Sequence, residues 1–133
     1  MLDETPPVPK RVILIVDDED VPRTFLEEYL SESFPEYEIR TAENGMTALG
    51  ILRDTKNIVI LITDWRMPNM NGGELIRQIP EKKRPDTIIL SGTIADIKSA
   101  QLDYNALRIK AVVQKPDLTP LREIITNILA KST

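Results

Sequence analysis

Five short apolar runs alternate along the chain with longer segments whose apolar residues recur at helical spacing. The runs cover residues 11–16, 37–42, 58–63, 87–90 and 111–114. Three of them are continuous Val, Ile and Leu sequences, a pattern typical of strands covered on both faces in a parallel sheet. We therefore predict five strands at these positions.

The first and last helices have the clearest patterns. A helix after the first strand is indicated by Pro22, which suits a first helical turn, and by apolar residues on one face. These residues are Phe25, Leu26, Tyr29 and Leu30. The last helix has the spacing i, i+3, i+4, i+7, i+8 at Leu121, Ile124, Ile125, Ile128 and Leu129. We predict Thr119 as its N-cap and Pro120 as its first residue.

Three further helices are predicted at about 44–53, 72–79 and 95–107. The last of these has a thin apolar stripe, interrupted by Asp96, Lys98 and Asp103. Five strand–helix units in series predict a doubly wound α/β fold with a five-stranded parallel sheet and right-handed crossovers.

The 133 residues are enough for one domain with a buried core, and we place this domain at residues 10–131. Residues 1–9, with three prolines, are expected to form a flexible lead-in. They lack the basic start and apolar stretch of a signal peptide. No apolar run approaches the roughly 20 residues of a membrane span, so we expect no membrane partner.

Composition restricts the chemistry. The chain has no cysteine and no histidine, which excludes thiolate nucleophiles, Cys- or His-based metal sites and a serine triad. Carboxylates, amines, hydroxyls and backbone groups remain, and they favour hard cations such as Mg²⁺. The net charge of −4 argues against direct binding of nucleic acid.

Polar groups stand where four of the predicted strands end. They are Asp17 and Asp18, then Asp64, then Ser91 with Gly92 and Thr93, and finally Lys115. In an open α/β sheet, ligands bind outside the carboxyl ends of the strands, so these groups should meet at one rim.

The predicted rim contains the parts needed for phosphoryl transfer. Three carboxylates close together raise one another's pKa unless a cation lies among them, and Mg²⁺ suits such oxygen ligands. Lys115 could pair with Asp64 or with a phosphoryl group. Ser91 and backbone N–H groups can donate to phosphate oxygens, and Gly92 allows close backbone approach. Glu19 and Asp20, by contrast, are expected to be only first-turn acids of a helix.

Four sequence blocks, "VDDED", "TDWRMPNMNG", "SGT" and "KP", resemble the signature blocks of receiver domains in bacterial two-component response regulators. The second block is especially similar to chemotaxis-type receivers. The resemblance extends from about residue 10 to residue 129, with the blocks in the family's order and spacing. It implies a flavodoxin-like (βα)5 fold with strand order 2-1-3-4-5.

The resemblance also implies roles for individual residues. Asp64 would be the phosphoacceptor. Mg²⁺, or Mn²⁺ as an alternative, would be held by Asp18 directly, by Asp17 through water, by Asp64 and by the backbone carbonyl of Arg66.

Other roles follow from the same resemblance. Ser91 would be the switch hydroxyl and Lys115 would contact the phosphoryl group, with a cis bond before Pro116. The backbone at Trp65 and Gly92 would bind phosphate, and the side chains of Arg66 and Thr93 would modulate dephosphorylation.

Two positions differ from the family's usual pattern. Val112 stands three residues before the lysine, where the family often has an aromatic switch residue, and Asp117 follows Pro116 where an aromatic is common. The standard coupling of Ser91 to an aromatic rotamer therefore cannot operate here. Nearby, we expect partial exposure of Trp65, packing roles for Met67 and Met70, and turn chemistry from Pro68 to Gly72.

The function implied is a phosphorylation-dependent signalling switch in the cytoplasm that is not a turnover enzyme. Its donor would be a sensor histidine kinase or histidine phosphotransfer protein, and its output a downstream protein or a covalently attached output domain. One alternative is a receiver-like interaction module that is never phosphorylated. Another is an aspartyl-nucleophile Mg²⁺-dependent phosphatase, although that class places a D-x-D motif after its first strand, and here Asp64 has no second acid two residues on.

Overall fold

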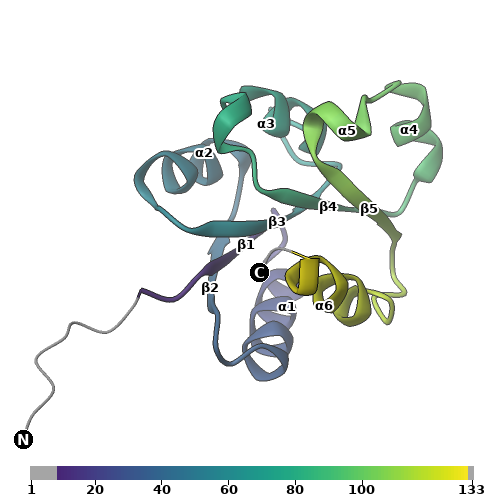
Figure 1. Ribbon diagram of the computed structural model, residues 1–133. Helices are drawn as coiled ribbons and strands as arrows, with labels where there is room; N and C mark the ends of the chain where they lie inside the picture. The colour runs from purple at the N-terminus through teal and green to yellow at the C-terminus, as the bar shows by residue number, and fades with distance from the viewer. Residues whose placement is uncertain (1–8, 132–133) are drawn as a thin grey trace, which may run out of the picture.

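A computed structural model describes residues 9–131, which form a parallel sheet with helices on both faces (Figure 1). The strand order is β2-β1-β3-β4-β5, as the resemblance implied. The strands are β1 Val12–Val16, β2 Glu38–Ala42, β3 Ile58–Asp64, β4 Asp86–Ser91 and β5 Ile109–Gln114. The predicted doubly wound fold is confirmed. The predicted lead-in, apart from Pro9, lies outside the described residues.

The helices divide between the two faces of the sheet. They are α1 Asp20–Ser33, α2 Gly45–Asp54, α3 Gly72–Gln78, α4 Ile94–Ser99, α5 Tyr104–Leu107 and α6 Leu121–Lys131, with a 3-10 turn, η1, at Glu81–Lys83. Figure 1 shows α1 and α6 on one face and α2 to α5 on the other. Within residues 9–131 no helix has the length and apolar character needed to cross a membrane.

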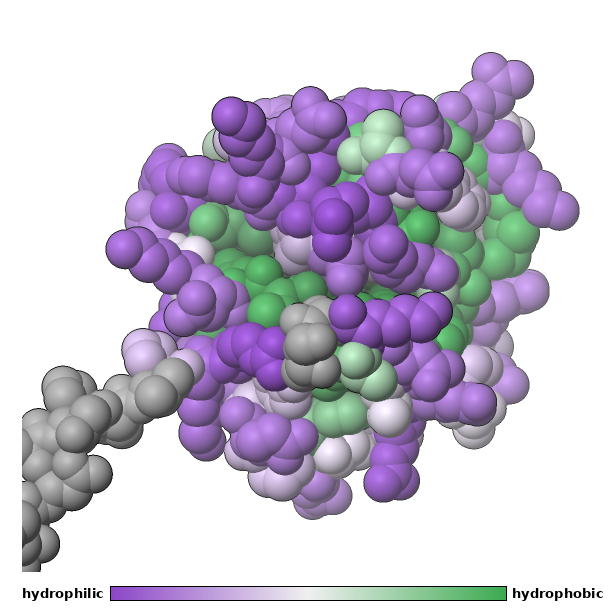
Figure 2. Space-filling view, in the orientation of Figure 1, coloured by the Kyte–Doolittle hydropathy of each residue, from purple (hydrophilic) through white to green (hydrophobic). Residues whose placement is uncertain are grey.

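Each face of the sheet has its own apolar core. Alternate residues of β1 supply both, since Ile13 and Ile15 pack towards α1 and α6 while Leu14 and Val16 pack towards α2 and α3. This alternation follows from the period of two along a strand. All five residues of β1 are buried, which explains the continuous apolar run in the sequence. In Figure 2 the hydrophobic residues show mainly between the helical layers, and the outward faces are mostly hydrophilic.

The prediction of one helix over 95–107 was wrong. The segment contains two short helices, α4 and α5, and Gln101 between them has a left-handed backbone with φ 51°. Asp103, which interrupts the apolar stripe, is the N-cap of α5, because its carboxylate accepts a hydrogen bond from the Ala106 N–H at 3.1 Å. The strand that follows begins at Ile109, two residues before the predicted start.

The start of α6 also differs from the prediction by one residue. The Thr119 hydroxyl donates to Asp117 Oδ1 at 2.6 Å, and the first i to i+4 bond of the helix is accepted one residue later, by Pro120, so Thr119 is not the N-cap. The carbonyl of Pro120 accepts from the Ile124 N–H at 3.1 Å, which puts Pro120 just before the first helical residue, Leu121. The hydroxyl instead fixes the turn that follows β5.

Candidate functional site

Backbone hydrogen bonds continue one residue beyond the strand ends and align the predicted site residues at the carboxyl rim. The Asp17 N–H donates to Ala42 O at 3.1 Å and the Lys115 N–H donates to Ser91 O at 2.9 Å. The third strand continues in the same way, and its Asp64 lies opposite Leu90 of β4. The backbone therefore fixes where each polar side chain begins.

Three carboxylates meet at this rim. Asp17 and Asp64 are buried, with 1% and 3% exposure, and Asp18 is exposed. One oxygen of each lies within 4.8 Å of the others. Asp17 Oδ1 accepts from the Glu19 N–H at 2.9 Å, whereas Asp17 Oδ2 has no hydrogen-bond partner among the described residues. A buried carboxylate oxygen without a donor is costly, and a hard cation bound to these oxygens would remove that cost. The residues thus fit Mg²⁺.

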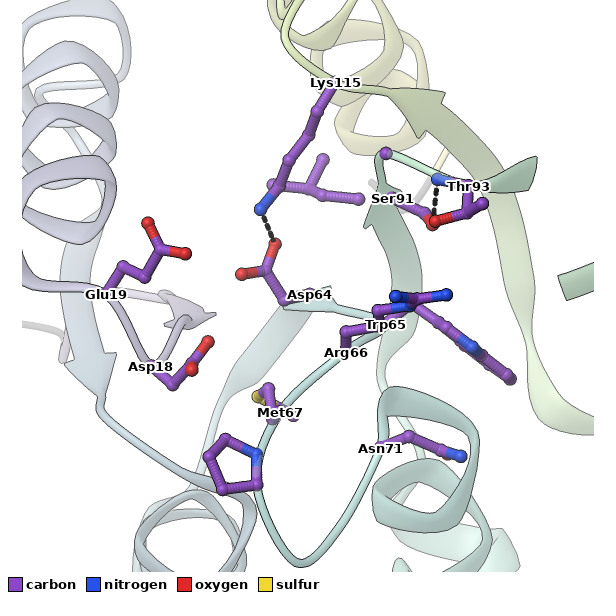
Figure 3. A pocket seen from close by; sticks show the side chains of 13 residues that line it. Asp18, Glu19, Asp64, Trp65, Arg66, Met67, Asn71, Ser91, Thr93 and Lys115 are labelled. Atoms are coloured by element: carbon purple, nitrogen blue, oxygen red, sulfur yellow. Dashed lines mark hydrogen bonds and ion pairs between the residues drawn. The ribbon is translucent and has the colours of Figure 1, made fainter. Parts of the chain in front are cut away.

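Lys115 is the cation that the structure itself places at the cluster. Its Nζ lies 2.6 Å from Asp64 Oδ1 and forms an ion pair (Figure 3). Burial raises the pKa of Asp64 to about 7; Lys115 opposes this rise, and Asp17 adds to it. Burial, the largest single influence, would lower the pKa of Lys115, but the combined effect of the ion pair with Asp64 and the charges of Asp17 and Glu19 raises it.

Ser91 is buried at the end of β4, and its Oγ accepts a hydrogen bond from the Thr93 N–H at 3.0 Å. A hydroxyl has one proton to donate in addition to its acceptor sites, so this contact leaves the proton of Ser91 available. Gly92 and Thr93 are exposed beside it. Figure 3 shows Ser91 on the side of Asp64 away from Asp18 and Glu19, and Lys115 reaching the Asp64 carboxylate from above.

The expectation of a partly exposed Trp65 was wrong, since this residue is 6% exposed. Its ring packs against α3, where a Cβ on Gly73 would lie 2.9 Å from Cη2 of the indole. The missing side chain of Gly73 therefore makes room for the ring. The Trp65 N–H donates to Leu90 O at 2.9 Å, so in this structure it is engaged in the sheet and not directed at a ligand.

The loop after β3 is held by turn and cap residues, as predicted. Asn69 has a left-handed backbone with φ 70°. Asn71 forms a capping box with Glu74 at the start of α3. Gly72 is required by close approach, because a Cβ there would lie 2.7 Å from the carbonyl oxygen of Asp64. The first turn of α3 is thus packed directly against the backbone of the predicted phosphoacceptor.

Arg66 makes a contact that the sequence did not indicate. Its Nε and Nη2 donate to Asp96 Oδ2 in α4, at 2.9 and 2.5 Å. The two residues are 30 positions apart, and both side chains are at least partly exposed, so neither burial nor spacing could indicate the pair.

An open pocket of about 690 Å³ joins these elements. Its lining includes Asp18, Asp64, Arg66, Ser91, Thr93 and Lys115. Met67 lines it as well and packs, half-buried, against the core that contains the buried Met70, so the predicted packing roles of both residues are confirmed. Val112 lies away from the pocket lining, half-buried on β5 opposite Ile89, and it packs against the core beneath α2 to α5.

The fold and the acidic rim together define a flavodoxin-like α/β signalling domain. The chain belongs to the response regulator receiver domain family, whose model matches residues 13–126. The chemotaxis protein CheY homolog of Campylobacter jejuni is 31% identical over 120 residues, which are 88% of this chain and 91% of that protein.

Solved structures agree with this assignment. A response regulator receiver protein from Pseudomonas putida has a TM-score of 0.76 and 31% identity, over 90% of this chain and 98% of that chain. The response regulator TrrA from Thermotoga maritima, crystallised with Mg²⁺-BeF, has a TM-score of 0.73 and 32% identity, over 89% of this chain and 98% of that chain. The protein is thus a receiver domain of two-component signalling with an acidic pocket that fits Mg²⁺.

Proposed function

We propose that the protein is a phosphorylation-dependent switch in which Asp64 accepts a phosphoryl group from a phosphohistidine. The arrangement that carries this proposal is the Asp64–Lys115 ion pair at 2.6 Å beside two further carboxylates, one with an unpartnered buried oxygen. The phosphohistidine would belong to a sensor histidine kinase or a histidine phosphotransfer protein, since none of these 133 residues is a histidine.

In the transfer step an oxygen of the Asp64 carboxylate attacks phosphorus. The new O–P bond forms as the P–N bond breaks, and the electron pair of the P–N bond stays on the imidazole nitrogen. Lys115 stabilises the negative charge that develops on the phosphoryl oxygens, since its Nζ already contacts Asp64. Asp17, Asp18, Asp64 and the Arg66 carbonyl would hold Mg²⁺. The metal, when bound, supplies charge neutralisation at the phosphoryl oxygens.

The output depends on Ser91. Its free proton can donate to a phosphoryl oxygen, and this contact draws the loop of residues 91–93 towards Asp64. The loop leads directly into α4, so the equilibrium of the face formed by α4, α5, β5 and α6 shifts. Val112 provides no aromatic ring to report the movement of Ser91. The backbone bond from Lys115 to Ser91 O offers a second link between β4 and β5.

In this proposal the protein works in the cytoplasm and does not turn over a substrate. It phosphorylates and dephosphorylates only itself, and its readout is binding to a downstream protein or to an attached output domain. Turnover of a small phosphomonoester would contradict it and would favour the phosphatase alternative.

Incubation with Mg²⁺ and acetyl phosphate tests the proposal. Intact-protein mass spectrometry should show a labile increase of one phosphoryl group, which is absent in Asp64→Asn. Asp54→Asn is the matched control, because Asp54 is an exposed aspartate at the end of α2, and it should be labelled like the parent. No label on the parent, or a label that persists in Asp64→Asn, would overturn the assignment and would leave the non-phosphorylated interaction module.

A further inference from the structure

The ion pair between Arg66 and Asp96 joins the loop that follows the phosphoacceptor to the first turn of α4. Two of the three guanidinium nitrogens, Nε and Nη2, donate to a single carboxylate oxygen, Asp96 Oδ2. Arg66 is only two residues past Asp64, and its side chain lines the same pocket. In Figure 3 this side chain extends towards the Ser91–Thr93 segment and away from Asp18 and Glu19.

The contact matters because α4 has few other anchors. The helix has six residues, too short to be stable alone, and Ile97 is its buried residue. Its N-cap, Thr93, makes no side-chain capping bond. Asp96 stands in the first turn, so the pair with Arg66 fixes the end of α4 nearest to the pocket.

We propose that Asp96 is a positioning residue that holds the Arg66 guanidinium on α4 until a phosphoryl group on Asp64 competes for it. This inference rests on the proposed function. A phosphoryl group carries close to two negative charges and three acceptor oxygens, so it is a stronger partner for a guanidinium than one carboxylate oxygen. The side chains of Arg66 and Asp96 are 72% and 36% exposed, and such a solvent-screened pair is weak enough to exchange.

The competition has a reciprocal consequence. If breaking the Arg66–Asp96 pair is part of binding the phosphoryl group, then occupation of Asp64 must weaken the anchor of α4 by the same factor. The pair therefore connects the chemistry at Asp64 to α4 without an aromatic residue at position 112. An exposed ion pair corresponds to a factor of about two to five in an equilibrium constant.

Beryllium fluoride, a mimic of the phosphoryl group, tests the competition at saturating Mg²⁺. Its affinity can be followed by the fluorescence of Trp65, the single tryptophan, which is buried next to Asp64. Asp96→Asn frees Arg66 and should bind beryllium fluoride about two- to five-fold more tightly than the parent. In an Arg66→Gln background the same change at Asp96 should have no effect. Asp96→Glu should stay close to the parent, and high salt should remove the difference.

Asp54→Asn removes the same charge from an exposed Arg–Asp pair on α2 and serves as the control; it should not change the affinity. Equal effects of Asp96→Asn in the two backgrounds, or no effect in the parent background, would overturn the role of Asp96. A parent protein that neither binds beryllium fluoride nor reacts with acetyl phosphate would instead overturn the proposed function itself.

Discussion

Replacing Asp64 by Asn should stabilise the metal-free protein, because the fold holds this carboxylate in an unfavourable place. Asp64 is 3% exposed, and burial raises its pKa to about 7 from 3.8 even with Lys115 beside it. Asparagine has nearly the same shape and no charge to desolvate. The substitution therefore removes a cost that the parent bears whenever Asp64 is ionised without a metal.

The pKa difference gives the magnitude and the sign. From 3.8 to about 7, at roughly 1.4 kcal/mol for each pH unit, the cost of ionisation reaches at most about 4 kcal/mol. The pocket is open to solvent, so screening reduces the expected gain to about 2 to 4 kcal/mol. A carboxyl with a higher pKa in the folded state binds more protons when folded. Its stabilising contribution is complete below pH 4 and is lost as the pH rises towards 7.

Urea unfolding in EDTA, followed at pH 8 and pH 5.5, measures the effect. Asp64→Asn should exceed the parent in unfolding free energy at pH 8, and the advantage should fall by about half at pH 5.5. Asp54→Asn, which removes an exposed carboxylate, should differ little from the parent at either pH. If the advantage is absent, or is the same at both pH values, then ionised Asp64 does not destabilise the folded protein and the prediction is wrong.

Three further outcomes are expected. Gly72→Ala should lower both the unfolding free energy and the yield of acetyl phosphate labelling, because the new Cβ would lie 2.7 Å from the carbonyl oxygen of Asp64. The control Gly50→Ala, whose new Cβ would lie 3.9 Å from its nearest neighbour, should instead raise the unfolding free energy in urea by up to about 1 kcal/mol. Asn71→Ala should lose about 1 kcal/mol by the same assay, since it removes the side-chain oxygen that accepts from the Glu74 N–H; a neutral result would mean that α3 does not depend on its cap. Mg²⁺ should raise the Tm of the parent in differential scanning fluorimetry and raise that of Asp17→Asn much less, and equal shifts would show that Asp17 is not a ligand.

The sequence predicts the positions of strands whose residues are mostly buried, on both faces of the sheet. β1 and β3 are buried on both faces, so their apolar runs show their positions directly, with an error of one residue. The helix boundary at α4 and α5 could not be predicted in the same way, because it depends on Gln101 adopting a left-handed conformation that its side chain does not indicate. Asp103 belongs to a residue type that favours N-caps, so it marks the start of α5 and not only an interruption of the apolar stripe.

At the site, the sequence places the residues that end strands. Asp17, Asp64 and Ser91 are fixed by the sheet, so knowledge of the strand ends is enough to bring them together. Contacts between side chains on separate surface elements are different. The Arg66–Asp96 pair depends on two exposed side chains from distant segments, and no periodicity in the chain encodes it.

The unequal lengths of the helices on the two faces have a consequence for hydrogen exchange. α1 and α6 have 14 and 11 residues, whereas on the other face α2 has 10 and α3, α4 and α5 have only 7, 6 and 4. Opening α4 or α5 exposes little apolar surface, and it leaves the sheet and the core under α1 and α6 in place. Amides of α4 and α5 should therefore exchange through local opening, while those of β1 and β3 exchange only when the whole domain unfolds. The sheet thus separates α4 and α5, which can rearrange at low cost, from α1 and α6, which preserve the fold while they do so.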